Sequence, residues 1–479
     1  MAKKEQEQFV AHIAKRDEDF SQWYTDVILK TDMVDYSDVK GCMVIKPYGY
    51  GIWELIQQQM DARFKATGHK NAYFPLLIPE SLLKKEAEHV KGFAPEVAWV
   101  TQGGDEQLQE RLAIRPTSET IICSMYAKWV QSYRDLPVLM NQWCNVVRWE
   151  KSTRPFLRTS EFLWQEGHTV HATAKEAEEE TEKMLGVYKE FAENVLAIPV
   201  IVGQKSEKEK FAGAHHTYTM EALMQDGKAL QMGTSHNLAQ HFAKVYDIQF
   251  LDRDGQLKYG YTTSWGTSTR MIGGLIMVHG DDRGLVLPPK VAPTQVIILP
   301  IAMHKEGVLE KANELYAQLK EAGIRVELDE RDQSAGWKFN EAELKGIPAR
   351  IEIGPRDIQN GIVTIVRRDT LEKLTAPIDG IVETILKLLD DIHATLLEKA
   401  RTRRDAQTTL ATNMEELAQG VKKGFVKAMW CGCRACEDKV KEETGATTRC
   451  MPFDAEKVAD TCVVCGKIAD KLMVFARAY

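Results

Sequence analysis

The segment Val147–His168 reads VRWEKSTRPFLRTSEFLWQEGH and lies at the centre of the predicted fold. It opens in an apolar run, Cys144–Trp149, that predicts a strand. Arg148 and Glu150 are two positions apart on that strand, so their side chains project from the same face. Such a pair could hold a phosphate and an amino group together, and the polar loop KSTRPF suits closure over a small ligand. Taken alone, Arg-x-Glu on a strand is more often a cross-strand ion pair.

Around this segment, short apolar runs predict further strands of one sheet, and helical spacing predicts the helices that cover it. The expected strands are Ala72–Ile78 and Pro137–Leu139, and the expected helices are Ile52–Phe64 and Lys175–Leu196. The first forty residues are expected to form a helical extension. Because strands and helices follow one another irregularly, the pattern predicts an α+β domain on a largely antiparallel sheet.

Beyond a linker at Lys290–Thr294 the order of elements becomes regular. Strands and helices alternate, which predicts a compact α/β domain. The expected elements are Gln295–Ile301, Glu306–Ala322, Ile324–Leu328, Ser334–Lys345 and Ala349–Ile353. A long helix over Ile378–Arg404 leads into a cysteine-rich tail, which is expected to form a small α/β domain. The expected domain boundaries are 1–290, 291–395 and 396–479.

The composition argues against two classes of protein. Of 479 residues, 44% are hydrophobic and 27% charged, and the net charge is −7, which argues against a protein that coats nucleic acid by bulk electrostatics. The charged N-terminus has no signal peptide, and no run approaches the roughly 18 apolar residues that cross a bilayer. We therefore expect a cytoplasmic protein with no membrane partner. The basic cluster Lys399–Arg404 could contact RNA phosphates or form a solvated helix face.

Six of the nine cysteines lie between residues 431 and 465. In a reducing compartment such a cluster suggests a metal before disulfides. Cys431 and Cys436 form one pair, and Cys462 and Cys465 form a C-x-x-C pair. Two such pairs can supply four thiolates to a tetrahedral zinc that has no open position. Two spare cysteines leave the ligand set open, and six buried thiols without metal are the alternative; the spare ones are Cys433 and Cys450.

The segment Thr262–Pro289, TTSWGTSTRMIGGLIMVHGDDRGLVLPP, is a second arrangement suited to a phosphate. Gly266 and small hydroxyl residues precede Arg270, and an apolar run that predicts a helix follows. A polar entry with a glycine lets backbone and one arginine approach a phosphate closely. Without context, such a segment is more often the ordinary start of a core helix.

Together these segments resemble the signature motifs of class II aminoacyl-tRNA synthetases. The helix and strand that end at Pro75 resemble motif 1, VRWE with its loop and Phe162 resembles motif 2, and the segment around Arg270 resembles motif 3. Five stretches are similar to prolyl-tRNA synthetases of the archaeal and eukaryotic type: RPTSETI (Arg115–Ile121), RTSEFLWQEGH, EKFAG (Glu209–Gly213), MGTSH (Met232–His236) and TSWGTSTR. The resemblance covers nearly the whole chain in the family's order.

The resemblance implies an enzyme that activates L-proline with ATP and Mg²⁺ and transfers the prolyl group to the 3′ end of tRNA(Pro). Arg148 would bind the α-phosphate and the proline carboxylate, and Arg270 would contact the γ-phosphate. Both would act as catalytic residues by positioning and charge stabilisation, without a covalent nucleophile. Glu150 would hold the adenine amino group, and Phe162 would stack on the ring. The remaining ATP contacts would be Arg158, Thr159, Gln231 and Thr234.

The proline pocket implied by the resemblance suits its ligand. A small apolar ring needs an aromatic wall, and its ammonium needs an acceptor such as Glu119. Besides Arg148, the pocket would be lined by Thr117, Glu119, Trp164, Glu166, His168, Phe211, His236 and Ser268. Outside this context the two aromatic residues would more often be core, and the two histidines structural. Whether Phe156 and Leu157 belong to the site or to the core stays undecided.

The C-terminal half resembles the family as well. Residues 292–376 are similar to an anticodon-binding domain, whose readers would be Phe339, Glu343, Arg350 and Arg356. An ordinary exposed helix and strand is the alternative for any one of them. In the family's tail the structural zinc ligands correspond to Cys431, Cys436, Cys462 and Cys465, and the final tyrosine, here Tyr479, folds back toward the active site.

Motif 1 implies a homodimer, because it forms the subunit interface in this class. Only about sixty residues separate His168 from Gln231, so the editing insertion of the bacterial-type family is absent. Three alternatives are a synthetase for another amino acid, an inactive RNA-binding paralogue, and a zinc-ribbon nucleic-acid binder. The pocket segments argue against the first, the retained arginines against the second, and the length of the chain against the third.

Overall fold

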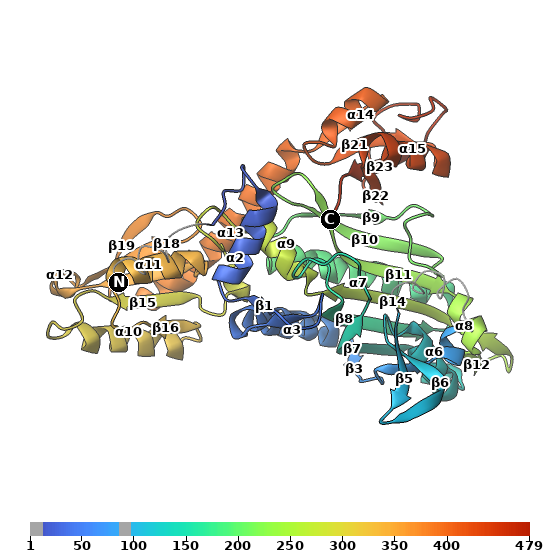
Figure 1. The fold of residues 1–479 in the computed structure, drawn as a ribbon, viewed down its shortest axis with the longest axis horizontal. Coiled ribbons are helices and arrows are strands. Elements are labelled where there is room, and N and C mark those ends of the chain that lie inside the picture. The colour runs from blue at the N-terminus through green and yellow to red at the C-terminus, as the bar shows by residue number, and fades with distance from the viewer. Residues whose placement is uncertain (1–12, 86–96) are drawn as a thin grey trace.

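The computed structural model describes residues 13–85 and 97–479. Its centre is an eleven-stranded sheet that runs through the middle of the molecule (Figure 1). All neighbouring strands are antiparallel except β20 with β21 and β3 with β7. The strands, in spatial order, are β20 (Thr409–Ala411), β21 (Val426–Trp430), β23 (Lys471–Ala476), β22 (Thr447–Pro452), β9 (Val200–Gln204), β10 (His216–Leu223), β11 (Ala229–Ala239), β14 (Tyr261–Ser268), β8 (Glu161–His171), β7 (Val138–Val147) and β3 (Lys70–Asn71). The expectation of an α+β fold on a largely antiparallel sheet is confirmed.

One face of this sheet is covered by helix α7 (Ala174–Asn194), which begins at a capping box formed by Thr173 and Glu176. Its buried side, with Tyr188 and Phe191, packs into the same core as Trp265 of β14. Three more helices contribute to that core: α2 (Phe20–Lys30), α3 (Pro47–Ala66) and α9 (Arg270–His279). Because side chains of a strand alternate between faces, the opposite face is left for the candidate site.

Smaller elements surround the large sheet. A three-stranded sheet contains β4 (Leu77–Pro79), β5 (Ala98–Gly103) and β6 (Glu106–Ile114), and two two-stranded sheets contain β1 (Val34–Tyr36), β2 (Met43–Ile45), β12 (Gln249–Leu251) and β13 (Leu257–Tyr259). The helices of this region are α4 (Glu80–Leu83), α6 (Glu119–Trp129) and α8 (His241–Tyr246). Short 3₁₀ turns occur at Tyr133–Asp135 and Pro289–Val291.

Two expectations about these strands are wrong in detail. The apolar run Ala72–Ile78 is not one strand: it joins β3 to β4, which belong to different sheets. The two runs Pro137–Leu139 and Cys144–Trp149 overlap one strand, β7, which ends at Val147, so Arg148 and Glu150 follow the strand instead of lying on it. The polar residues Asn141 and Gln142 interrupt the apolar pattern in the middle of this strand, so the pattern alone predicts two short runs. In the fold their side chains are satisfied by hydrogen bonds to Asn71 and Ser118. Part of the expected N-terminal extension, residues 1–12, lies outside the residues described.

The second domain is the expected α/β unit, at one end of the molecule (Figure 1). Its sheet has the order β16 (Val326–Leu328), β15 (Val296–Pro300), β17 (Ala349–Ile353), β18 (Ile362–Arg367) and β19 (Lys373–Pro377). The strands β16, β15 and β17 are parallel, whereas β18 pairs antiparallel with both β17 and β19. Its helices are α10 (Val308–Glu321), α11 (Ala335–Leu344), α12 (Pro355–Gln359) and α13 (Ile381–Ala406).

The C-terminal unit, with α14 (Met414–Gly420) and α15 (Arg434–Thr444), extends the central sheet through β22 and β9. At this junction a Cβ on Gly203 would stand 2.3 Å from the Met451 carbonyl oxygen, so only glycine allows the two strands to meet. Across residues 13–85 and 97–479, no helix is long and apolar enough to span a bilayer.

Candidate active site

The candidate site lies on the face of the large sheet opposite α7. The strand register pairs Glu166 with Gly266, and it pairs Ser264 with both His168 and His236. Side chains two positions apart on a strand, and those of residues paired across neighbouring strands, point to the same face of the sheet. Three neighbouring strands, β8, β14 and β11, therefore supply a single polar floor.

All nine residues that the sequence assigned to an amino-acid pocket line one cavity of about 260 Å³. That volume is close to the lower end of the range for small-molecule sites. The nine are Thr117, Glu119, Arg148, Trp164, Glu166, His168, Phe211, His236 and Ser268. They come from six separate segments of the chain, so the fold brings together residues that no local pattern could connect.

Glu166 is a buried carboxylate of this cavity with several hydrogen bonds. Its oxygens accept from the Ser118 backbone at 3.1 Å, from the Ser118 hydroxyl and from Gln142 Nε2 at 2.8 Å, and one lies 2.9 Å from His168 Nε2. Burial would raise the pKa of Glu166, but the hydrogen bond and charge of His168 outweigh it and lower that pKa. Burial would lower the pKa of His168, and Glu166 outweighs it in turn and raises that pKa. Glu166 and His168 thus form an ion pair that holds the floor.

His236 behaves differently from His168. Its two ring nitrogens lie 2.9 Å from the Thr217 hydroxyl and 3.0 Å from the Thr234 hydroxyl. Burial lowers the pKa of His236 to about 3, and the positive charges of His168 and Arg148 add to this. Its ring is therefore neutral at physiological pH, and it stacks on Phe211 with centroids 4.5 Å apart. The pair forms a flat, uncharged wall beside a charged floor.

A second cavity adjoins the first and shares Arg148, Phe162, Ser268 and Arg270 with it. The eight residues that the sequence assigned to ATP all lie on one or both cavities. Glu150, Arg158 and Thr159 line the second, Gln231 and Thr234 line the first, and Arg148, Phe162 and Arg270 line both. The undecided residues Phe156 and Leu157 line the second cavity.

The two shared arginines both donate hydrogen bonds to backbone carbonyls. Arg148 Nε donates to the Pro116 carbonyl at 3.0 Å, and Arg270 Nε donates to the Leu157 carbonyl at 3.1 Å. The Arg148 guanidinium lies 5.5 Å from the Phe162 ring centroid. Burial lowers the pKa of Arg270 to about 10, and the charges of Arg148 and Arg158 contribute. Arg270 stays protonated at neutral pH, so the cavities meet between two cations that suit a polyanion.

Sequence reasoning missed other residues of the larger cavity. Most of them belong to segments already quoted: Glu209, Met232, Gly233, Ser264, Trp265, Gly266 and Thr267. The alternation of side chains along β14 could have identified Ser264, whose buried hydroxyl has no hydrogen-bond partner within the described part of the chain. Lys205 and Thr217 belong to no quoted motif, and only the fold brings them to the cavity.

Comparison with known proteins agrees with this geometry over the whole chain. Residues 99–279 match the family model of the tRNA synthetase class II core domain (G, H, P, S and T), residues 295–388 match the anticodon binding domain, and residues 414–479 match the prolyl-tRNA synthetase C-terminal domain. The proline–tRNA ligase of Alkaliphilus oremlandii is 66% identical over 100% of both chains. Proline–tRNA ligase 2 of Clostridioides difficile is 63% identical, again over 100% of both. The chain belongs to the proline–tRNA ligase family.

A solved structure extends this likeness to three dimensions. The prolyl-tRNA synthetase of Cryptosporidium parvum, complexed with halofuginone and AMPPNP, is 44% identical, with a TM-score of 0.94 over 97% of this chain and 99% of that one. The chain is thus an aminoacyl-tRNA synthetase, a ligase that joins proline to tRNA, with a class II core, an anticodon-binding domain and the C-terminal domain of prolyl-tRNA synthetases.

In the anticodon-binding domain, three of the four expected readers lie together. The Arg350 guanidinium stands 4.3 Å from the Phe339 ring centroid, and Arg350 Nη1 lies 3.3 Å from a Glu343 oxygen. Arg350 is itself buried and also bonds to Glu352 at 3.0 Å. The fourth, Arg356, is exposed on α12.

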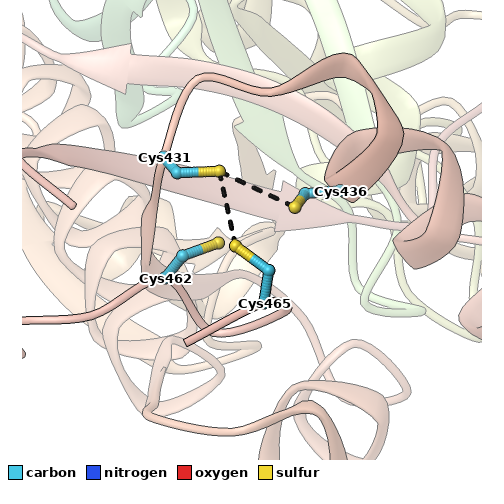
Figure 2. A group of neighbouring side chains, drawn as sticks. All are labelled: Cys431, Cys436, Cys462 and Cys465. Carbon is cyan, nitrogen blue, oxygen red and sulfur yellow. Dashed lines mark hydrogen bonds between the residues drawn. The ribbon is translucent and has the colours of Figure 1, made fainter. Parts of the chain in front are cut away.

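Four cysteine sulfurs of the C-terminal domain converge on one point, as Figure 2 shows. The sulfurs of Cys431, Cys436, Cys462 and Cys465 all lie within 4.8 Å of one another. Cys431 Sγ is 3.6 Å from Cys436 Sγ and 3.7 Å from Cys465 Sγ. A tetrahedral ion with bonds of about 2.3 Å would separate its sulfurs by about 3.8 Å, so the group fits a metal. The spare cysteines, Cys433 and Cys450, lie outside it.

Proposed function

We propose that the larger cavity binds proline and, at Gln231 and Thr234, part of ATP, and that the second cavity, with the shared arginines, binds the rest of ATP. The observation that carries this proposal is the position of Arg148 and Arg270 at the junction of the two cavities. A carboxylate and a triphosphate that meet there would bring negative charge together. Two fixed guanidinium groups would oppose that repulsion, and their attraction for the reacting groups would grow as negative charge develops in the transition state.

The reaction follows from this arrangement. A proline carboxylate oxygen attacks the α-phosphorus in line, a new O–P bond forms, and the bond to the β-phosphate breaks to release pyrophosphate. Arg148 would hold the carboxylate and the α-phosphate, and Arg270 the γ-phosphate. Mg²⁺, when bound with ATP, would supply further neutralisation of the pyrophosphate. The ribose hydroxyl at the 3′ end of tRNA(Pro) then takes the prolyl group and releases AMP.

The polar and aromatic walls would select proline. Trp164 and the stacked pair of Phe211 and His236 offer apolar faces to the pyrrolidine ring. Glu119, which accepts from the Thr117 hydroxyl, would accept from the secondary ammonium. Neutral His236 adds no cation to repel that ammonium. On the nucleotide side, Phe162 and Glu150 would hold the adenine ring and its amino group.

ATP–pyrophosphate exchange without tRNA tests both assignments. We expect proline to support exchange above the other nineteen amino acids, and R148A to lower it by at least about a hundredfold, as for loss of a transition-state contact. R253M, at an exposed arginine distant from both cavities, is the matched control. Exchange with another amino acid would overturn the proline pocket, and an active R148A would overturn the role of the arginine.

We also propose that Phe339, Glu343, Arg350 and Arg356 read the anticodon. Support comes from the cluster of the first three and from the exposure of Arg356, since single-stranded bases are read by stacking and by charged edges. F339A and R356M are expected to raise KM for tRNA in aminoacylation and to leave tRNA-independent exchange unchanged. Unchanged KM for tRNA would contradict the assignment.

The four-cysteine group is proposed to hold one structural Zn²⁺. Its four sulfurs leave no open position for a substrate, which favours stability over catalysis as the role of the ion. We propose the boundaries 1–290, 291–395 and 396–479 for the three domains.

A cytoplasmic homodimer is the form in which we propose that the enzyme works. Nine free thiols suit a reducing compartment. The edge strand β3 is followed by Tyr73, which is 72% exposed, and Trp129 nearby is 45% exposed. A second copy would cover these aromatic side chains. Light scattering is expected to give a dimer for the wild type and a monomer for Y73E, and Y36E at another exposed tyrosine is the control.

A further inference from the structure

A buried ion cluster lies where β9, β10 and β22 meet, and it joins two domains. Glu221 of β10 is fully buried. Its Oε1 accepts from Lys205 Nζ at 2.9 Å, and its Oε2 accepts from Arg449 Nε at 3.0 Å and Nη2 at 2.9 Å. Lys205 is only 4% exposed and Arg449 only 7%. One carboxylate therefore meets two cations, and the cluster keeps a net charge of one positive unit.

The cluster borders the proposed ATP site. Lys205 lines the larger cavity together with Gln231 and Thr234, which are proposed to contact ATP, and Glu221 lies opposite Gln231 across the β10–β11 ladder. Facing side chains of such a pair have Cβ atoms about 5 Å apart. The charges of Glu221 and Arg449 both act on the pKa of Arg270, after burial and nearer arginines. Glu221 raises that pKa and Arg449 lowers it, so the charges of these two residues reach the junction of the two cavities.

Arg449 decides the sign of that charge. Without its guanidinium, Glu221 would cancel the charge of Lys205, and the cluster would be neutral. With it, Glu221 is matched and the Lys205 charge is left over. Charges act over longer distances in a buried, low-dielectric site than in water, so this one unit matters to a polyanionic ligand.

We propose that Arg449, which belongs to the C-terminal domain, is a positioning residue of the ATP site that neutralises Glu221 and so leaves the Lys205 charge for the triphosphate. The proposal rests on the proposed assignment of that site. It gives the C-terminal domain a part in amino-acid activation that is separate from holding a metal. The main support for the proposal is that Glu221 accepts hydrogen bonds from both Lys205, which lines the cavity, and Arg449, which belongs to another domain.

Other contacts keep the C-terminal domain docked when Arg449 is changed. Ser206 Oγ donates to Glu437 Oε1 at 2.8 Å, and Lys208 Nζ lies 2.7 Å from Asp438 Oδ1. The β22–β9 pairing adds backbone contact at Gly203. An effect of Arg449 on ATP can therefore be separated from undocking.

The first experiment measures KM for ATP and for proline by pyrophosphate exchange in full-length R449M. One unit charge acting over roughly 10 Å at an effective dielectric of about 20 changes an equilibrium by on the order of tenfold. We therefore expect KM for ATP to rise about tenfold, with little change in KM for proline. K439M removes an exposed cation from α15 of the same domain and is expected to match the wild type. Equal KM for ATP in R449M and wild type would overturn the proposal, while exchange by the wild type would leave the proposed function standing.

A second variant distinguishes charge from structure. In E221Q/R449M the Lys205 charge is again left over, so KM for ATP is expected to return close to the wild-type value. A double variant as impaired as R449M would overturn the proposal in favour of a merely structural role. R449K, which keeps the charge, is expected to lie near the wild type. If R449M does not fold, E221Q is compared with E221Q/R449M, and a higher KM for ATP in E221Q would overturn the proposal.

Discussion

Gly167 lies directly beneath the indole of Trp265, and a Cβ at position 167 would stand 2.1 Å from Cε2 of that ring. The two residues are paired across β8 and β14, and Trp265 is fully enclosed in the core under α7. The ring cannot move aside without displacing Phe64, whose centroid lies 5.0 Å away. Gly167 is therefore what allows β8 to carry Glu166 and His168 so close to β14.

Gly167→Ala is expected to lower the free energy of unfolding by ~2 kcal/mol or more, because overpacking of a rigid core costs about 1–3 kcal/mol. Proline-dependent exchange should fall with it, since β8 must shift. Gly186→Ala is the matched control: a Cβ there meets nothing within 4 Å on the exposed side of α7. It should leave exchange unchanged and stabilise the helix by about 0.5–1 kcal/mol. Calorimetry of both variants checks this, and an equally stable G167A would contradict it.

The Glu166–His168 pair should make stability depend on pH in both directions. The pKa of His168 is raised above its ordinary 6.5, so its contribution is complete below that pH and is lost as pH rises through the folded-state pKa. The pKa of Glu166 is lowered below 4.5, so its contribution is present above that pH and is lost as pH falls through the folded-state pKa.

His168→Gln removes the alkaline part of this dependence. We expect the wild type to exceed H168Q in stability at about pH 6, and the difference to shrink at about pH 9, because His168 then loses its proton and its charge contact with Glu166. Thermal unfolding at the two pH values measures it. A difference that stays constant or grows with pH would mean that His168 is neutral in the folded protein.

The four-cysteine group predicts that the enzyme contains zinc. Purified enzyme is expected to carry one zinc per chain, and Cys436→Ser is expected to lose it, because a site with three thiolates binds more weakly and the ion contributes to folding. Cys433→Ser is the matched control, since Cys433 is exposed and outside the group. Elemental analysis decides the ligand set. Loss of zinc from C433S, with C436S unaffected, would show that the ligand set is different.

Local patterns found the long helices and the regular α/β domain. Residues Lys175–Leu196 were expected as a helix and α7 spans Ala174–Asn194, and β17 covers Ala349–Ile353 as expected. These elements have strong periodicity and short-range contacts. The prediction of one strand over Ala72–Ile78 is wrong because most of these apolar residues lie between β3 and β4, which belong to two different sheets.

Long-range relationships had no sequence signal. The pairing of Gly203 with Pro452 joins residues 249 positions apart in the sequence, and no periodicity reports it. Lys205 is a lone lysine in no motif, and it matters only through Glu221 and Arg449. By contrast, residues that share a quoted motif were brought to the two cavities together, because neighbours in sequence stay close in space, and on β8, β11 and β14 alternate side chains also face one way.

The C-terminal residue lies against the loop that borders the second cavity. The Tyr479 backbone N–H donates to the Ala229 carbonyl at 3.1 Å, and its hydroxyl donates to Asp226 Oδ2 at 2.6 Å. The Arg154 guanidinium stands 5.5 Å from its ring centroid, and Lys228 Nζ stands 4.8 Å from it. Arg154 belongs to the loop KSTRPF, so the end of the chain and the loop hold one another.

An extension after Tyr479 should therefore impair activation. Added residues would have to leave beside the ring, and they would compete with its contact to Arg154. We expect a C-terminal tag to raise KM for ATP in exchange several-fold, and Tyr479→Ala to act in the same direction, because both loosen the loop that leads to Arg158. Tyr479→Phe keeps the ring against Arg154 and should be milder. Removal of the tag by a protease should restore the untagged value. Identical KM for ATP in tagged, cleaved and Y479A enzyme would mean that the loop is ordered without the tail.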